Sequence, residues 1–265
     1  MEAPKIFTKA LNQHSGKDFE KHIYYFLTGE KLELSGIQFL DDIQQDAQFV
    51  ANKIKEELNP SDVIYAGDNY KQDGDLIIDS LPVEIKYVSG GGSGTYYNTS
   101  MSVFEKFDMK SFREFDTPIR NFLEPFFGKG VYENNSPVSM KESKFFRQDE
   151  ANYKLLKNID KECRKQYVNY IYNFFKVNKS VMVDFYHKML SKELSNKRAP
   201  EYIFVFDRTS KSTKVIRKSE LVKNDFVLSK NDLGFSISNL RFAVSWQNGC
   251  GLNNPTVRVF LNGSC

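Results

Sequence analysis

Cysteine and histidine, the usual ligands of zinc and the residues of thiol redox sites, are scarce in this sequence: there are three of each among 265 residues. The cysteines, Cys163, Cys250 and Cys265, are odd in number and widely spaced, so they predict neither a disulfide framework nor a CxxC zinc site. The histidines are equally scattered, which argues against zinc hydrolases and against nucleases built around a catalytic histidine motif. We therefore expect reduced thiols and a chemistry that uses other side chains.

Long apolar runs are also lacking. No window approaches the roughly eighteen uncharged apolar residues that a membrane helix needs. The first residues, MEAPKIFTKALNQ, do not contain the apolar stretch of a signal peptide. The sequence thus predicts a cytoplasmic protein without a membrane partner.

Net charge is weak, at +3, but it is unevenly distributed. Residues 139–198 contain fourteen Lys or Arg residues against seven Asp or Glu, interleaved with aromatic residues in KESKFFR and RKQYVNYIYNFFK. This mixture suits phosphate contact and base stacking, and Lys144 and Arg147 are candidate DNA contacts. An amphipathic helix with a solvated basic face is an equally good interpretation.

Periodicity predicts helices first and strands later. Residues 14–32 show helical spacing, with Ser15 as a cap and Gly29 as the end, and residues 41–60 show an apolar stripe that stops at Asn59 and Pro60. Short β-rich runs follow at 62–67, 74–79 and 82–88. Residues 101–127 and 149–176 read as helical, and β runs return at 201–207, 212–217, 241–246 and 256–261.

This order favours one mixed α/β domain over residues 1–265, because no clear linker marks a boundary. Residues 1–100 would hold the first helices and a hairpin, and residues 101–198 would form a basic helical insertion. Residues 199–265 would form a β-rich C-terminal part.

The hairpin QDGDLIIDSLPVEIKYV concentrates charge on one face. A turn at Asp79 and Ser80 would pair residues whose numbers sum to 159, which sets Asp75 opposite Glu84. Directly opposed Cβ atoms lie about 4.5–5.5 Å apart, so the two carboxylates would be able to share a divalent cation. Lys86 would lie on the same face, with Asp73 opposite it.

Two carboxylates at this distance repel each other unless a cation neutralises them. Mg²⁺ with oxygen ligands suits that role, and a nearby ammonium group would position water and stabilise negative charge, as phosphodiester hydrolysis requires. A polar outer face on an antiparallel hairpin would show the same alternation without any catalytic role.

Asp75, Glu84 and Lys86 in DGDLIIDSLPVEIK resemble the motif of the PD-(D/E)xK nuclease superfamily, and the whole chain resembles a type II restriction endonuclease. The resemblance implies a restriction-endonuclease-like mixed central sheet flanked by helices, here with a helical insertion. It departs from the family pattern at Gly74, where many family members have proline.

The resemblance also implies a role for each matching residue. Asp75 and Glu84 would bind Mg²⁺ with the carbonyl oxygen of Ile85, and Lys86 would orient or activate water. Glu20 resembles the acidic residue that many of these nucleases carry on their first helix, although a solvated helix glutamate is an equally good interpretation.

Two segments are candidates for DNA contact. SGGGSGTYYNTS leaves the end of the catalytic strand with little side-chain bulk, although a flexible connector without a ligand would look the same. Gln and Asn after Trp246 suit adenine edges, but a single tryptophan is commonly a core anchor and the following Asn-Gly is an ordinary turn. With the basic segment, the candidate DNA contacts are Ser93, Thr95, Tyr96, Asn98, Lys144, Arg147, Gln247 and Asn248.

The expected function is therefore that of a Mg²⁺-dependent, sequence-specific endonuclease acting on double-stranded DNA. The resemblance implies a homodimer, since palindromic sites favour two-fold symmetric proteins, and a cognate DNA methyltransferase that acts on the same site without having to bind this chain. Two alternatives stay open: a structure-selective repair or recombination nuclease of the same superfamily, and a non-catalytic module that binds DNA or protein.

Overall fold

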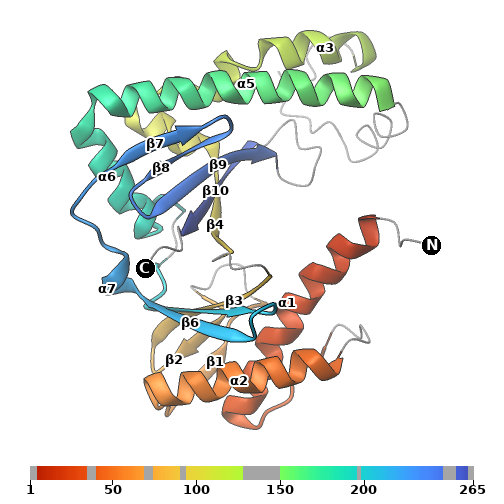
Figure 1. The fold of residues 1–265 in the computed structure, drawn as a ribbon, viewed down its shortest axis with the longest axis vertical. Coiled ribbons are helices and arrows are strands. Elements are labelled where there is room, and N and C mark those ends of the chain that lie inside the picture. The colour runs from red at the N-terminus through yellow and green to blue at the C-terminus, as the bar shows by residue number, and fades with distance from the viewer. Residues whose placement is uncertain are drawn as a thin grey trace. The chain divides into compact units, whose positions relative to one another are not determined.

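The computed structural model describes residues 5–34, 40–68, 74–89, 94–127, 150–195, 198–246 and 255–261. The chain divides into two compact units, which Figure 1 shows as ribbons. The first unit contains residues 1–94 and 189–222 with residue 265, and the second contains residues 95–188 and 223–264. The predicted mixed α/β class is confirmed. The predicted single domain with a helical insertion differs from this division, because the second unit contains a sheet of its own.

Two helices open the first unit. Helix α1 spans Lys5–Thr28, so Ser15 lies inside it and the predicted cap at Ser15 is wrong. The end at Gly29 is confirmed: its N–H donates to the Tyr25 carbonyl at 2.8 Å and its φ is +81°, a conformation that glycine adopts without strain.

Helix α2 spans Leu40–Leu58 and presents the predicted apolar stripe. Ile43, Ala47, Val50 and Ile54 are all buried, because their spacing sets them on one side of the helix. Asn59 ends the helix with a φ of +44°, and its N–H donates to the Lys55 carbonyl.

The strands of the first unit form a mixed sheet with the order β1-β2-β3-β5-β6. Neighbouring strands run antiparallel except β3 and β5, which run parallel. The short helices η4 (Glu193–Ser195) and α7 (Lys218–Leu221) flank β5 and β6 along the chain. The strand bounds are β1 Val63–Tyr65, β2 Leu76–Ile78, β3 Leu81–Val88, β5 Tyr202–Asp207 and β6 Ser212–Arg217.

Helices α1 and α2 cover one face of this sheet (Figure 1). Phe19 of α1 stacks on Tyr87 of β3, with ring centroids 4.1 Å apart. Val83 and Ile85 belong to the same buried cluster, so the odd-numbered residues of β3 face the helices. The even-numbered residues of β3 therefore point to the opposite face.

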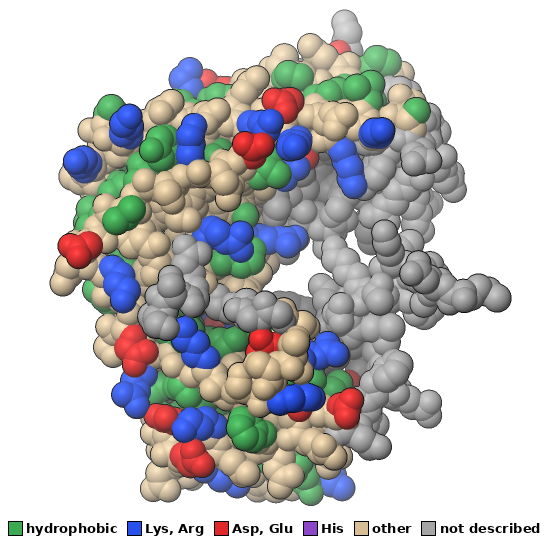
Figure 2. Space-filling view, in the orientation of Figure 1, with side chains coloured by type: hydrophobic (Ala, Val, Ile, Leu, Met, Phe, Trp, Pro, Cys, Tyr) green, Lys and Arg blue, Asp and Glu red, His purple; other side chains and the backbone are tan. Residues whose placement is uncertain are grey.

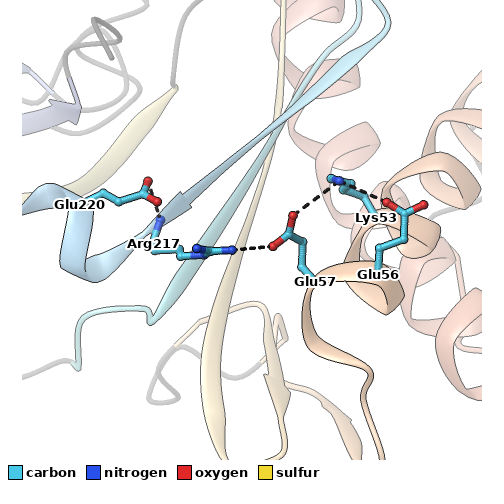
Figure 3. Close-up of polar contacts among 5 residues, drawn as sticks. All are labelled: Lys53, Glu56, Glu57, Arg217 and Glu220. Atoms are coloured by element: carbon cyan, nitrogen blue, oxygen red, sulfur yellow. Dashed lines mark hydrogen bonds and ion pairs between the residues drawn. The ribbon is translucent and has the colours of Figure 1, made fainter.

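Polar contacts also join α2 to the sheet. Asp46 of α2 accepts hydrogen bonds from the Tyr87 hydroxyl at 3.0 Å and from the Lys211 ammonium at 2.9 Å. At the other end of α2, Arg217 donates to Glu57 at 2.9 Å (Figure 3). Because both partners of this second contact reach solvent, it adds little stability.

In the second unit, the described strands form an antiparallel sheet with the order β4-β10-β9-β8-β7. Its core is aromatic: Phe235 stacks on Phe242 with centroids 4.7 Å apart, and Phe104 stacks on Phe185 at 5.2 Å. The bounds are β4 Thr95–Ser100, α3 Thr117–Phe127, α5 Glu150–Val177, α6 Lys179–Leu190, β7 Leu228–Asn231, β8 Gly234–Ile237, β9 Leu240–Trp246 and β10 Pro255–Leu261.

Residues 101–115 do not form the predicted continuous helix. They form three short 3-10 helices, η1 (Met101–Val103), η2 (Glu105–Phe107) and η3 (Phe112–Glu114). Asp108 interrupts them with a φ of +59°, and the Ser111 side chain accepts from the Arg113 N–H to start the next turn. These local contacts direct Phe107 and Phe112 into the core, where helical spacing alone would not bring both.

Helix α5 bears on the basic segment, for which the sequence left two interpretations: contact with phosphates and bases, or a solvated helix face. Tyr167 and Phe175 are completely buried, so these aromatic residues serve the core and are not available for base stacking. Exposed lysines such as Lys154 and Lys161 lie on its outer side. Figure 2 shows Lys and Arg side chains along this helix with acidic side chains among them.

Among the described residues, no helix combines the length and the apolar character that crossing a membrane requires.

Burial predicts which contacts of α2 stabilise the first unit. We expect Ile54→Ala to lower the free energy of unfolding by about 2–5 kcal/mol, because it leaves a cavity under a fully buried side chain. Arg217→Ala, which breaks the exposed pair with Glu57, should lower the free energy of unfolding much less than Ile54→Ala does. Urea denaturation of both variants tests this, and equal losses would contradict it.

Candidate active site

The charged hairpin has the predicted register. Leu76 pairs with Val83 and Ile78 with Leu81, so the paired numbers sum to 159. Asp79 and Ser80 form the turn with φ values of +48° and +70°, as a tight turn between twisted strands requires. Asp79 has a structural role, because its carboxylate accepts from the Ser61 hydroxyl at 2.6 Å.

Asp75 lies directly before strand β2, which begins at Leu76. Its N–H donates to the Val83 carbonyl at 2.9 Å, so the ladder shifts by one residue from the predicted pairing of Asp75 with Glu84. Its carboxylate oxygen Oδ2 accepts from the Ile85 N–H at 2.7 Å. The side chain thus replaces the backbone acceptor that a longer β2 would have supplied to β3.

Gly74 makes this arrangement possible. Its φ is +100°, and a Cβ there would lie 2.8 Å from the Val83 carbonyl oxygen. Proline holds φ near −65° and cannot adopt this conformation. A glycine at this position therefore follows from the local backbone.

Glu84 is buried, and lysines bind both of its carboxylate oxygens. Lys86 contacts Oε1, and Lys192 donates to Oε2 at 2.8 Å. Burial by itself would raise the pKa of Glu84, but the two ammonium groups outweigh burial and lower this pKa to about 2. Glu84 is therefore ionised at neutral pH.

Lys86 is a protonated lysine. Burial would lower its pKa, but the carboxylates of Glu84 and Asp75 outweigh burial and raise it above the ordinary value. The aliphatic part of its side chain lies beside Gly94, whose position would bring a Cβ within 3.6 Å of Cδ. At neutral pH this residue is a hydrogen-bond donor and a positive charge, not a base.

Glu20 of α1 belongs to the same cluster. Its Oε2 atom lies beside Gly67, next to Ala66, whose N–H donates to the Asp75 carbonyl. Burial and then the negative charge of Asp75 raise the pKa of Glu20 to about 9. Burial and the charge of Glu84 raise the pKa of Asp75 to about 6. The site therefore favours either a proton or a cation.

Two further residues of this site were not predicted. Lys192 is 108 positions from Glu84 in the sequence, and no motif links the two. The Tyr65 hydroxyl is buried without a hydrogen-bond partner among the described residues, and burial, followed by the charge of Glu20, raises its pKa. A lysine in SKELSNK and a tyrosine on a short strand carry no signal that sequence patterns would detect.

The predicted DNA contacts divide into two groups. Thr95, Tyr96 and Asn98 lie on β4, which pairs with β10 and is not the predicted loop. Asn98 is exposed, whereas Tyr96 is 2% exposed and packs inside the second unit, so its predicted DNA contact does not fit the structure. The remaining candidates lie outside the described residues: Ser93, Lys144, Arg147, Gln247 and Asn248. Asp73, the predicted partner of Lys86, also lies outside them.

The donor set fits a hard cation by its chemistry. Asp75, Glu84 and Glu20 supply oxygen donors of the kind that Mg²⁺ prefers. Among the described residues, however, no group of three or more His, Cys, Asp or Glu side chains is arranged so that it could hold a metal ion. Because a lysine binds each oxygen of Glu84, a cation at this carboxylate would share an oxygen with a lysine or displace that lysine.

Comparisons with protein-family models, with curated proteins and with solved structures find no match to this chain.

The raised pKa of Glu20 predicts how stability depends on pH. Between about pH 4.5 and 9 the folded chain retains a proton that the unfolded chain has lost, so the free energy of unfolding falls as pH rises. In EDTA at pH 8, Glu20→Gln should raise this free energy by about 1 kcal/mol or more, because Gln needs no proton. Exposed Glu56→Gln is the matched control and should change little. A less stable Glu20→Gln protein would contradict this.

Gly74 yields a second prediction. Gly74→Ala should lower the free energy of unfolding by about 1–3 kcal/mol, because alanine is strained at a φ of +100° and meets the Val83 carbonyl. Gly16→Ala, inside α1 with open space around its Cβ position, should instead gain about 0.5–1 kcal/mol. Denaturation curves of both variants check the difference in sign.

Proposed function

We propose that this chain is a Mg²⁺-dependent endonuclease that hydrolyses phosphodiester bonds in double-stranded DNA, in the manner of type II restriction endonucleases. The observation that carries the proposal is the grouping of Asp75, Glu84 and Lys86 beside the start of β2, together with Glu20 from helix α1. Two carboxylates and a lysine at this spacing occur in many proteins; here a third carboxylate, Glu20, lies beside them.

The first unit also supports a restriction-endonuclease-like fold. The hairpin of β2 and β3 is antiparallel, and the chain then returns in β5 parallel to β3. Helices cover one face of this mixed sheet, and Glu84 and Lys86 point to the other. We take a mixed sheet with helices on one face as support for the fold that the sequence resemblance implies.

The side chains divide the chemistry between them. Asp75 and Glu84 would hold the cation, with Glu20 as a third carboxylate and the Ile85 carbonyl as the ligand that the resemblance implies. When bound, Mg²⁺ supplies positive charge against the phosphate and makes nearby water more acidic. Lys86 donates hydrogen bonds from its ammonium group, which orients water and stabilises the charge that develops on the phosphate oxygens.

Duplex DNA as the substrate follows from the same resemblance and from the exposed lysines of α5, which suit phosphate contacts. A sequence-specific enzyme of this kind would act as a homodimer on palindromic sites.

The test is cleavage by wild type and by Lys86→Ala. With Mg²⁺ and a long unmethylated duplex, wild type should give discrete fragments, and EDTA should abolish them. Lys86→Ala should cut at least about 100-fold more slowly, because it removes a charge that stabilises the transition state. Lys218→Ala is the matched control: it breaks a lysine–glutamate pair of 2.7 Å with Glu201, outside the site, and should cut like wild type.

Other outcomes select the alternatives. Cutting confined to junctions or flaps would make the chain a structure-selective nuclease of the same superfamily. Salt-sensitive binding without cutting on duplex, branched or methylated DNA would overturn the nuclease proposal in favour of a binding module.

A further inference from the structure

Lys192 has the less exposed side chain of the two lysines that contact Glu84. Its side chain is 5% exposed, against 20% for Lys86, and its Nζ lies 2.8 Å from Oε2 of Glu84. It comes from the turn after α6, just before η4, so a segment distant in sequence contributes to the hairpin site.

The backbone at Lys192 is unusual as well. Its φ is +58°, a left-handed conformation that glycine or asparagine normally supplies after a helix. Its N–H donates to the Met189 carbonyl at 3.3 Å, in keeping with a helix end. A lysine here combines an unfavourable backbone conformation with the desolvation of an ammonium group, and the pairing with Glu84 offsets both.

Lys192 supplies the second positive charge of the site. The ammonium groups of Lys86 and Lys192 contact the two carboxylate oxygens of Glu84, and the Asp75 carboxylate lies close enough to interact with them. Without Lys192, a buried pair of carboxylates would face one lysine, which is a net negative charge in a poorly solvated place.

We propose that Lys192 is the resident counter-ion of Glu84: its ammonium group holds the carboxylate in the metal-free protein and competes with a divalent cation for the same oxygen. This inference rests on the proposed function, because it takes Glu84 as a ligand of the cation. Lys192 is a positioning residue and acts on the reaction only through Glu84.

A purely structural role makes a different prediction. If Lys192 only tied the turn after α6 to β3, its removal would destabilise the site and weaken cation binding. As a competitor, its removal takes a positive charge away from the cation's ligand, so cation binding becomes tighter. The sign of the change in affinity therefore separates the two roles.

The experiment is isothermal titration calorimetry of Mg²⁺ into DNA-free protein. We expect Lys192→Met to bind Mg²⁺ about tenfold more tightly than wild type, because a unit charge a few ångströms away is lost. Lys192→Arg keeps the charge and should bind like wild type. Lys218→Met removes a lysine from the outlying pair with Glu201 and should also bind like wild type.

A second measurement does not depend on the folding of Lys192→Met. In ¹⁵N spectra of the lysine ammonium groups, wild type should show a protected Lys192 signal, assigned through its loss in Lys192→Arg. Saturating Mg²⁺ should shift or broaden this signal, because the cation displaces or reorients the ammonium group.

The outcomes are distinguishable. If wild type cuts DNA and binds Mg²⁺, but Lys192→Met binds it no more tightly or the Lys192 signal ignores the cation, the counter-ion role is overturned and the nuclease proposal stands. If neither wild type nor any variant binds Mg²⁺ and none cuts DNA, the proposed function fails and the role of Lys192 fails with it.

Discussion

Strand β2 begins only at Leu76 and leaves the Ile85 N–H without a backbone acceptor, so the carboxylate of the preceding Asp75 accepts this hydrogen bond at 2.7 Å. A buried backbone donor must be satisfied, so this hydrogen bond fixes Asp75 at the end of the ladder. Gly74 is required for the same reason, since its positive φ lets the segment before β2 turn away from the neighbouring strand β3. The backbone therefore determines where the first carboxylate of the site lies.

The carboxylates that this geometry gathers would repel one another without counter-charges. Lys86 and Lys192 bind opposite oxygens of Glu84, and Glu20 keeps its proton to a much higher pH than an exposed glutamate would. Such a cluster is poorly suited to stabilising a fold, because each buried charge must be desolvated. Under the proposed function, a cation and a phosphate would complete this balance of charge.

Sequence patterns predicted best where a residue's neighbours in sequence are also its neighbours in space. The stripe of α2 and the pairing of Leu76 with Val83 depend on spacing and on one turn, and both are confirmed. The helix predictions failed at two places in the described chain. Ser15 is an ordinary cap residue, yet α1 continues through it, and residues 101–115 follow helical spacing but form 3-10 turns around a left-handed Asp108.

The sequence by itself determined the mixed α/β class, the hairpin and its register, and the face that carries Glu84 and Lys86, because alternation and turn chemistry are local. Only the tertiary structure decided that the ladder shifts at Asp75, that Glu20 joins the cluster, and that the strands divide between two units. It alone brought Lys192 to Glu84, since 108 residues of chain separate them and a buried charge selects its partner by proximity in the fold, not along the sequence.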